Sequence, residues 1–147
     1  MKKTLQYFVA ILFIAITSNL LGQQYYNYNT QGTNNAFPLN SLPATGKTTQ
    51  TLYLAGAFNQ PSPAPSGNIT KLYLMASSTG NATYTSLTIK MGQTTDIDLP
   101  TGAWYTGSMA TVFDENNFNL VGTAGQFMVI TLETPFNYNP AQSLVVE

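Results

Sequence analysis

The chain has 147 residues and a formal net charge of −1, which suffices for one domain with one hydrophobic core. It contains no cysteine, histidine or arginine, so it offers no disulfide, no thiolate or imidazole catalysis and no bidentate guanidinium clamp for phosphate. The scarcity of cations also argues against nucleic acid and anionic membrane surfaces as partners.

Residues 1–22 have the parts of a secretory signal peptide. Two lysines precede an uninterrupted apolar run at residues 8–16, and polar residues follow it. Because that run is too short to span a bilayer comfortably, we favour cleavage over a retained anchor and expect no stable membrane insertion of the mature chain. Cleavage after Gly22 would place a small residue at the last position of the leader, as required. Leu20, two residues earlier, fits poorly, so the exact cleavage site stays open. Gln23, where a lipoprotein would need cysteine, argues against lipid anchoring.

The next segment, residues 23–49, has no clear period and is expected to form an extended N-terminal arm. Two runs after it, at residues 50–55 and 70–75, share a Leu-Tyr-Leu centre and predict β-strands. The leucines face one side of each strand, while Tyr53 and Tyr73 face the other. Alternating prolines between the two runs predict an exposed, semi-rigid connection.

Two alternating segments lie in the middle of the chain. Residues 82–91 predict a strand whose odd-numbered side chains point inward, with Tyr84 among those that point to solvent. Residues 94–99 also alternate, which places Asp96 and Asp98 on one exposed face. Paired carboxylates can act as the acid and base of a glycosidase or bind calcium, but a solvated strand face is the favoured interpretation.

The turn-rich connection at residues 99–107 carries the only tryptophan. Trp104 and Tyr105 together form the kind of platform on which a sugar ring stacks. Loop aromatics also commonly cap the open end of a β-sandwich, and this interpretation is modestly favoured.

A further strand is predicted at residues 109–113, and residues 114–117 are expected to form the turn after it. Asp114 and Glu115 in this turn are candidate calcium ligands. The spacing of an EF-hand is not met, so calcium is a minority hypothesis and no other cofactor is expected.

The longest β-type run after the leader lies at residues 126–133. Both of its faces are largely apolar, which predicts a central strand covered on two sides and ended by Pro135. The last residues, 143–147, alternate as a strand beside it and stop while still apolar. We therefore expect the domain to be truncated at its C-terminus and the chain to be a fragment of a longer protein.

About seven short strands at near-regular spacing, with no amphipathic helix after the leader, predict an all-β fold. Residues 50–147 are expected to form an antiparallel β-sandwich, with a jelly-roll arrangement as first choice and an immunoglobulin-like one as second.

Three runs, at residues 58–71, 87–92 and 130–138, together resemble one known module. It is the N-terminal β-rich region of large secreted Bacteroidota proteins, which commonly carry a type IX secretion sorting domain at their far end. The resemblance implies export across the outer membrane and an extracellular or cell-surface location. This sequence contains no such sorting domain, and the resemblance supplies no catalytic residues.

Three functions follow as hypotheses. The leading one is a non-catalytic structural or adhesion module of a larger extracellular protein, with glycans or other surface proteins as partners. The second is a carbohydrate-binding module, accessory to a secreted hydrolase, that uses Trp104, Tyr105, Tyr53 and Tyr73. The third is a glycosidase built on the four carboxylates Asp96, Asp98, Asp114 and Glu115.

Overall fold

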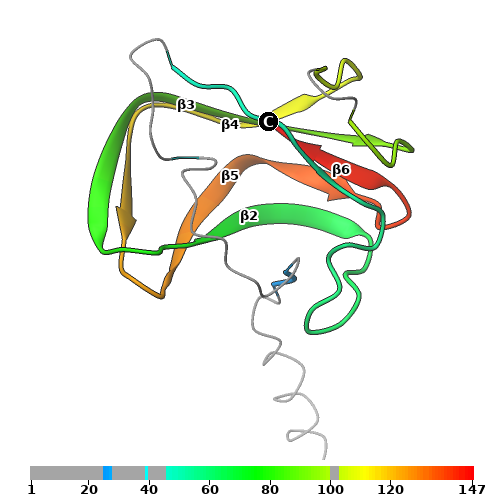
Figure 1. The fold of residues 1–147 in the computed structure, drawn as a ribbon, viewed down its shortest axis with the longest axis horizontal. Helices are drawn as coiled ribbons and strands as arrows, with labels where there is room; N and C mark the ends of the chain where they lie inside the picture. Colours follow the sequence, from blue (N-terminus) through cyan, green and yellow to red (C-terminus); the bar gives the residue numbers. More distant parts are fainter. Residues whose placement is uncertain (1–24, 28–38, 40–45, 100–102) are drawn as a thin grey trace, which may run out of the picture.

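The computed structural model describes residues 25–27, 39, 46–99 and 103–147. In this part of the chain six strands form two antiparallel sheets packed face to face, which confirms the predicted all-β sandwich (Figure 1). None of the described residues belongs to a helix that could cross a membrane. The signal peptide predicted for residues 1–22 and most of the arm predicted for residues 23–49 lie outside the described residues.

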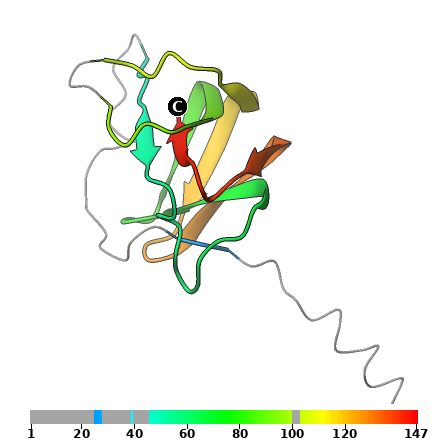
Figure 2. The ribbon, with the colours of Figure 1, turned by 90° about the vertical axis from the view of Figure 1, so that its right-hand side faces the viewer.

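The larger sheet has four strands in the order β1-β6-β3-β4. They are β1 (Thr51–Tyr53), β6 (Ser143–Val146), β3 (Gly80–Thr94) and β4 (Ala110–Gly122). The short strand β6 pairs on both sides, because Val145 lies opposite Leu52 of β1 and Gly92 of β3 (Figure 2). The last strand of the chain therefore lies inside this sheet.

The smaller sheet consists of β2 (Gly67–Met75) and β5 (Phe127–Tyr138). The prediction that β6 lies beside residues 126–133 is wrong, because β5 pairs with β2 and β6 belongs to the other sheet. The prediction that Pro135 ends the strand is also wrong. The register of β2 against β5 shifts between Ile69 and Lys71, and this irregularity accommodates a proline that has no N–H to donate.

Only one face of β5 is covered. Ile130 and Leu132 are buried, whereas Phe127 and Val129, which alternate with the buried side chains, are exposed. The prediction of a central strand with two covered faces is therefore wrong. Phe127 and Val129, at the start of its outer face, remain exposed apolar side chains.

Strands β3 and β4 bend together while they remain paired (Figure 1). Ile89 and Tyr84 are five residues apart and would point to opposite faces of a straight strand, yet both are buried. On the partner strand Asn117 has φ +56°, a left-handed conformation at the bend. The prediction that Tyr84 faces solvent is wrong because this bend turns the far end of the strand pair over the core.

The hydroxyl group of the buried Tyr84 has a hydrogen-bond partner. It donates a 2.7 Å hydrogen bond to the carbonyl oxygen of Leu39. Burial raises the pKa of the Tyr84 phenol above its usual value.

Two further boundaries differ from prediction. Residues 114–117 continue β4 instead of forming a turn, because their exposed polar side chains pair across the strands, as Thr88 Oγ1 does with Asp114 Oδ1 at 2.7 Å. Strand β3 ends at Thr94, so residues 95–99 are not strand. Ile97, which alternates with Asp96 and Asp98 in this segment, is itself 81% exposed.

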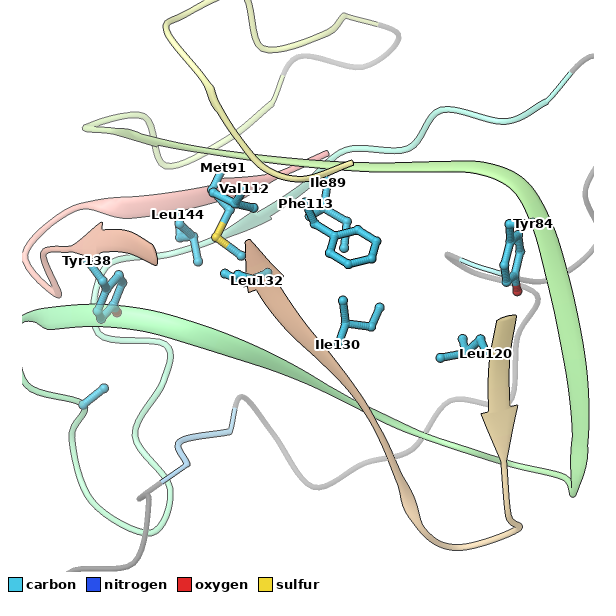
Figure 3. Close-up of a cluster of buried hydrophobic side chains, with 11 residues drawn as sticks. Tyr84, Ile89, Met91, Val112, Phe113, Leu120, Ile130, Leu132, Tyr138 and Leu144 are labelled. Atoms are coloured by element: carbon cyan, nitrogen blue, oxygen red, sulfur yellow. The ribbon is translucent and has the colours of Figure 1, made fainter. Parts of the chain in front are cut away.

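The core fills the space between the two sheets, with the bend of β3 and β4 closing one end (Figure 3). Met91, Val112 and Ile130 are among its most completely buried side chains. Figure 3 labels ten of its residues: Tyr84, Ile89, Met91, Val112, Phe113, Leu120, Ile130, Leu132, Tyr138 and Leu144.

Candidate functional site

An exposed apolar surface lies at one end of the outer face of the β2–β5 sheet. Tyr73 lies opposite Val129 and Met75 lies opposite Phe127, so these four side chains form two adjacent cross-strand pairs on one face. Met75 is 57% exposed, Val129 46% and Phe127 40%. Together with Tyr25 from the arm, they form what we call the outer aromatic surface: Tyr25, Tyr73, Met75, Phe127 and Val129.

Three rings in this surface contact one another. The centroid of Tyr25 lies 5.7 Å from that of Tyr73 and 5.8 Å from that of Phe127, and Tyr73 and Phe127 are 6.0 Å apart. These tilted and edge-to-face arrangements are the favourable ones for aromatic pairs. Tyr25 remains 47% exposed, so the cluster is accessible although its rings support one another.

Tyr53 occupies a different environment from Tyr73, despite the Leu-Tyr-Leu pattern that both share. Its ring lies 5.1 Å from Phe58, whose ring lies 6.0 Å from the buried Tyr138. Tyr53 and Phe58 both pack against the core. The structure therefore separates the two candidate tyrosines, and only Tyr73 belongs to an exposed aromatic cluster.

The connection between β3 and β4 presents the other pair of candidate aromatics. Trp104 is 53% exposed, whereas Tyr105 is half-buried. The Tyr105 N–H donates to Gln50 Oε1 at 2.7 Å, and Gln50 Nε2 donates to the Tyr105 carbonyl oxygen at 3.4 Å. The Tyr105 hydroxyl also donates to the Gln93 carbonyl oxygen at 3.3 Å. Tyr105 is thus an anchor of the connection, and Trp104 is the side chain that it leaves in solvent.

Gln50 is itself held by the residue that follows β6. Its Nε2 donates to Glu147 Oε2 at 2.7 Å, and Lys90 Nζ donates to Glu147 Oε1 at 2.7 Å. These hydrogen bonds, from Lys90 first and Gln50 second, lower the pKa of the Glu147 carboxyl below its usual value. Lys90, one of the even-numbered residues predicted to point to solvent, forms this ion pair.

The connection packs closely on the outer face of the four-stranded sheet at Gly92. A Cβ at this glycine would lie 2.7 Å from the Ser108 carbonyl oxygen and 3.3 Å from Tyr105 Cε1. A Cβ at Gly107 would collide with the Tyr105 ring. Val145, opposite Gly92 and therefore on the same face, is fully buried although this face is not the core. The connection therefore covers this part of the sheet.

The four candidate carboxylates do not converge. Asp96 and Asp98 are exposed on residues 95–99, beyond the end of β3. Asp114 and Glu115 are consecutive on β4, so their side chains point to opposite faces. The Asp114 main-chain N–H donates to Glu133 Oε2 at 3.2 Å, which joins β4 to β5. Calcium binding by Asp114 and Glu115 stays a prediction, and the residues that the structure describes contain no group of three potential metal ligands.

No known protein family matches this chain, and neither curated proteins nor solved structures provide a match. Function therefore has to be inferred from the outer aromatic surface and from the connection that carries Trp104. Sequence reasoning missed Met75, Phe127 and Val129 as members of an exposed surface. The alternation of β5 was the available signal, but its two apolar faces suggested double coverage. Gln50 had no local signal at all, because its partners are far away in the sequence.

Proposed function

We propose that this chain is a non-catalytic adhesion module of a larger exported protein, displayed on the cell surface or released from it. The observation that carries the proposal is the outer aromatic surface. Tyr, Phe and Met are the residue types enriched at the centres of protein interfaces. The leader predicted for residues 1–22 and the resemblance to secreted surface proteins support the extracellular location.

The composition of this surface favours an extracellular protein as its partner. Four of its five side chains are 40–57% exposed and Tyr73 is partly buried, so the surface offers on the order of 400 Å² of apolar area. A stable dimer buries about 800 Å² on each partner. One copy of the surface therefore supports a weak contact, and many copies on one cell would be needed for strong attachment. Weak contacts multiplied by valency are what adhesion requires.

The placement of the carboxylates supports a non-catalytic role. A glycosidase needs two carboxyl groups that flank one bond, about 5 to 10 Å apart, with the acid kept protonated by burial. Asp96, Asp98, Asp114 and Glu115 are all exposed, and the last two point to opposite faces of β4.

The proposal is tested with beads that carry the protein at high density on plates coated with fibronectin, laminin or collagen. We expect bead retention on at least one protein, with no measurable binding by the free protein at the same concentration. The double variant Phe127→Ser/Val129→Ser should abolish retention. Val121→Ser, which removes an exposed apolar side chain from β4, is the control and should not.

Equal retention of the double variant and the unaltered protein would contradict the proposal, as would the absence of retention on every coating. Release of reducing sugars from polysaccharides, lost on replacement of a carboxylate, would identify an enzyme instead.

A further inference from the structure

We propose that Trp104 is the stacking residue of a second binding site, which takes one ring of a neutral saccharide. This site goes beyond the adhesive contact proposed above and does not depend on it. The two are on different sheets: the outer aromatic surface belongs to β2 and β5, whereas Trp104 lies on the connection that covers β3 and β6.

The first argument is that the main chain next to Trp104 is held in place. The residue after it is held by both main-chain polar groups, since the Tyr105 N–H and carbonyl oxygen both hydrogen-bond to the side chain of Gln50. This amide pairs with the main chain as a neighbouring strand would. A binding residue on a loop gains affinity when the loop is ordered before the ligand arrives.

The second argument is that Gln50, which holds the Tyr105 main chain, is itself held by other residues. Gln50 is oriented by Glu147, and Glu147 by Lys90, at 2.7 Å in each case. The Tyr105 ring lies over Gly92 and its hydroxyl reaches the Gln93 carbonyl oxygen. Three separate segments of the chain therefore hold the main chain next to an indole that makes no contribution to the core.

The third argument is the exposure of the indole itself. Trp104 is 53% exposed, whereas its neighbour Tyr105 is half-buried beneath the connection. An indole has an apolar face with a partial negative charge and one N–H donor at its edge. The C–H groups on one side of a pyranose ring complement such a face, and its hydroxyl groups accept from such a donor.

The choice of a neutral sugar follows from the charges. The described part of this connection carries two acidic side chains, Asp96 and Asp98, and no cationic one, so its charge disfavours an anionic ligand. The chain has no arginine with which to recognise a carboxylate or phosphate. An uncharged ligand rich in hydroxyl groups is therefore the class that fits.

Trp104 provides its own probe because it is the only tryptophan of the chain. Cellohexaose, laminarihexaose and xylohexaose are titrated into the full chain while indole emission and its quenching by acrylamide are recorded. We expect a saturable change in emission, with protection from acrylamide, for at least one of the three. Calorimetry should show that Trp104→Ala weakens binding at least about tenfold and that Trp104→Phe weakens it less.

Gln50 is a positioning residue in this proposal, and Gln50→Leu tests that role. We expect weaker saccharide binding and, in the free protein, stronger quenching of Trp104 by acrylamide because the connection is no longer clamped. Gln126→Leu, in the exposed turn before β5, is the matched control and should change neither quantity. Circular dichroism verifies that both variants are folded.

No saturable change with any of the three saccharides would overturn the proposal, as would unchanged affinity in Trp104→Ala. Unchanged quenching in a folded Gln50→Leu variant would overturn the positioning role. The double variant Phe127→Ser/Val129→Ser should retain saccharide binding, and Trp104→Ala should retain bead attachment. Failure of one proposed function therefore leaves the other measurable.

Discussion

Lys90 Nζ lies 2.7 Å from Glu147 Oε1, and the main chains of the same two residues exchange both of their hydrogen bonds at 2.9 Å. The pair extends the ladder between β3 and β6 by one residue and adds a charge-assisted contact to it. Because Glu147 also accepts from Gln50, the ion pair connects the sheet to the connection that carries Trp104.

The first prediction concerns pH. Hydrogen bonds in the folded state lower the pKa of Glu147 below its ordinary value of 4.5. Its contribution to stability is therefore complete above 4.5 and is lost as the pH falls through the lower, folded-state pKa. Glu147→Gln should reduce the free energy of unfolding at neutral pH by about 0.2–1 kcal/mol, a small amount because the pair is partly exposed.

Urea unfolding of both proteins across the acidic range measures this effect. The difference between them should shrink as the pH falls below 4.5. Lys90→Gln removes the other partner and should show the same convergence. A difference that stays constant with pH would show that the ion pair does not stabilise the fold.

The second prediction concerns the close contact at Gly92. In Gly92→Ala the new Cβ meets the Ser108 carbonyl oxygen at 2.7 Å, so the connection must move away from the sheet. We expect a loss of about 1–3 kcal/mol in the free energy of unfolding. The emission of Trp104 should shift as well, because its clamp is displaced.

Gly80→Ala on the same strand is the control. No atom lies within 4 Å of a Cβ at this position, so stability should be unchanged or rise by about 0.4–1 kcal/mol. Equal effects of the two substitutions in chemical denaturation would argue that the contact at Gly92 is not tight.

The third prediction separates the two faces of β5. Ile130 is 2% exposed and faces the core, so Ile130→Ala should cost about 2–5 kcal/mol. Val129, the preceding residue, lies on the outer aromatic surface, and Val129→Ala should cost less than about 1 kcal/mol. Thermal or urea unfolding of the two variants makes the comparison. Similar losses would mean that the outer face is also covered.

The fourth prediction concerns the buried hydroxyl of Tyr84. Tyr84→Phe keeps the ring and removes the 2.7 Å hydrogen bond to the Leu39 carbonyl oxygen, so we expect a loss of about 0.5–1.5 kcal/mol. Tyr84→Ala also empties part of the core and should cost about 3–5 kcal/mol. If Tyr84→Phe is neutral in urea unfolding, the hydrogen bond contributes nothing net.

Local alternation was sufficient to identify most strands of this chain. The second Leu-Tyr-Leu run lies in β2, and the run at residues 82–91 lies in β3, whereas β1 covers only Thr51–Tyr53 of the strand predicted at residues 50–55. Alternation was not sufficient to place Tyr84, because successive side chains point to alternate faces in a regular way only while the strand is straight. The bend opposite Asn117 exchanges the two faces, and only its pairing with β4 reveals this.

The candidate site was harder to predict for a different reason. Trp104 was selected by residue type alone, and the structure adds Gln50, which lies 55 residues before its partner Tyr105. On β5, the sequence shows that Phe127 and Val129 are apolar but not whether another layer covers them, and in the structure they are exposed. Coverage depends on which elements pack nearby, and no local pattern encodes it.

The position of β6 between β1 and β3 has a consequence for how the chain folds. Thr51 pairs with Val146, so β1, the first strand of the described residues, finds its neighbour only in β6. Strands β3 and β4, and β2 and β5, can pair before β6 exists. Contacts between residues so far apart form slowly. During synthesis β1 therefore has no partner strand until β6 has emerged.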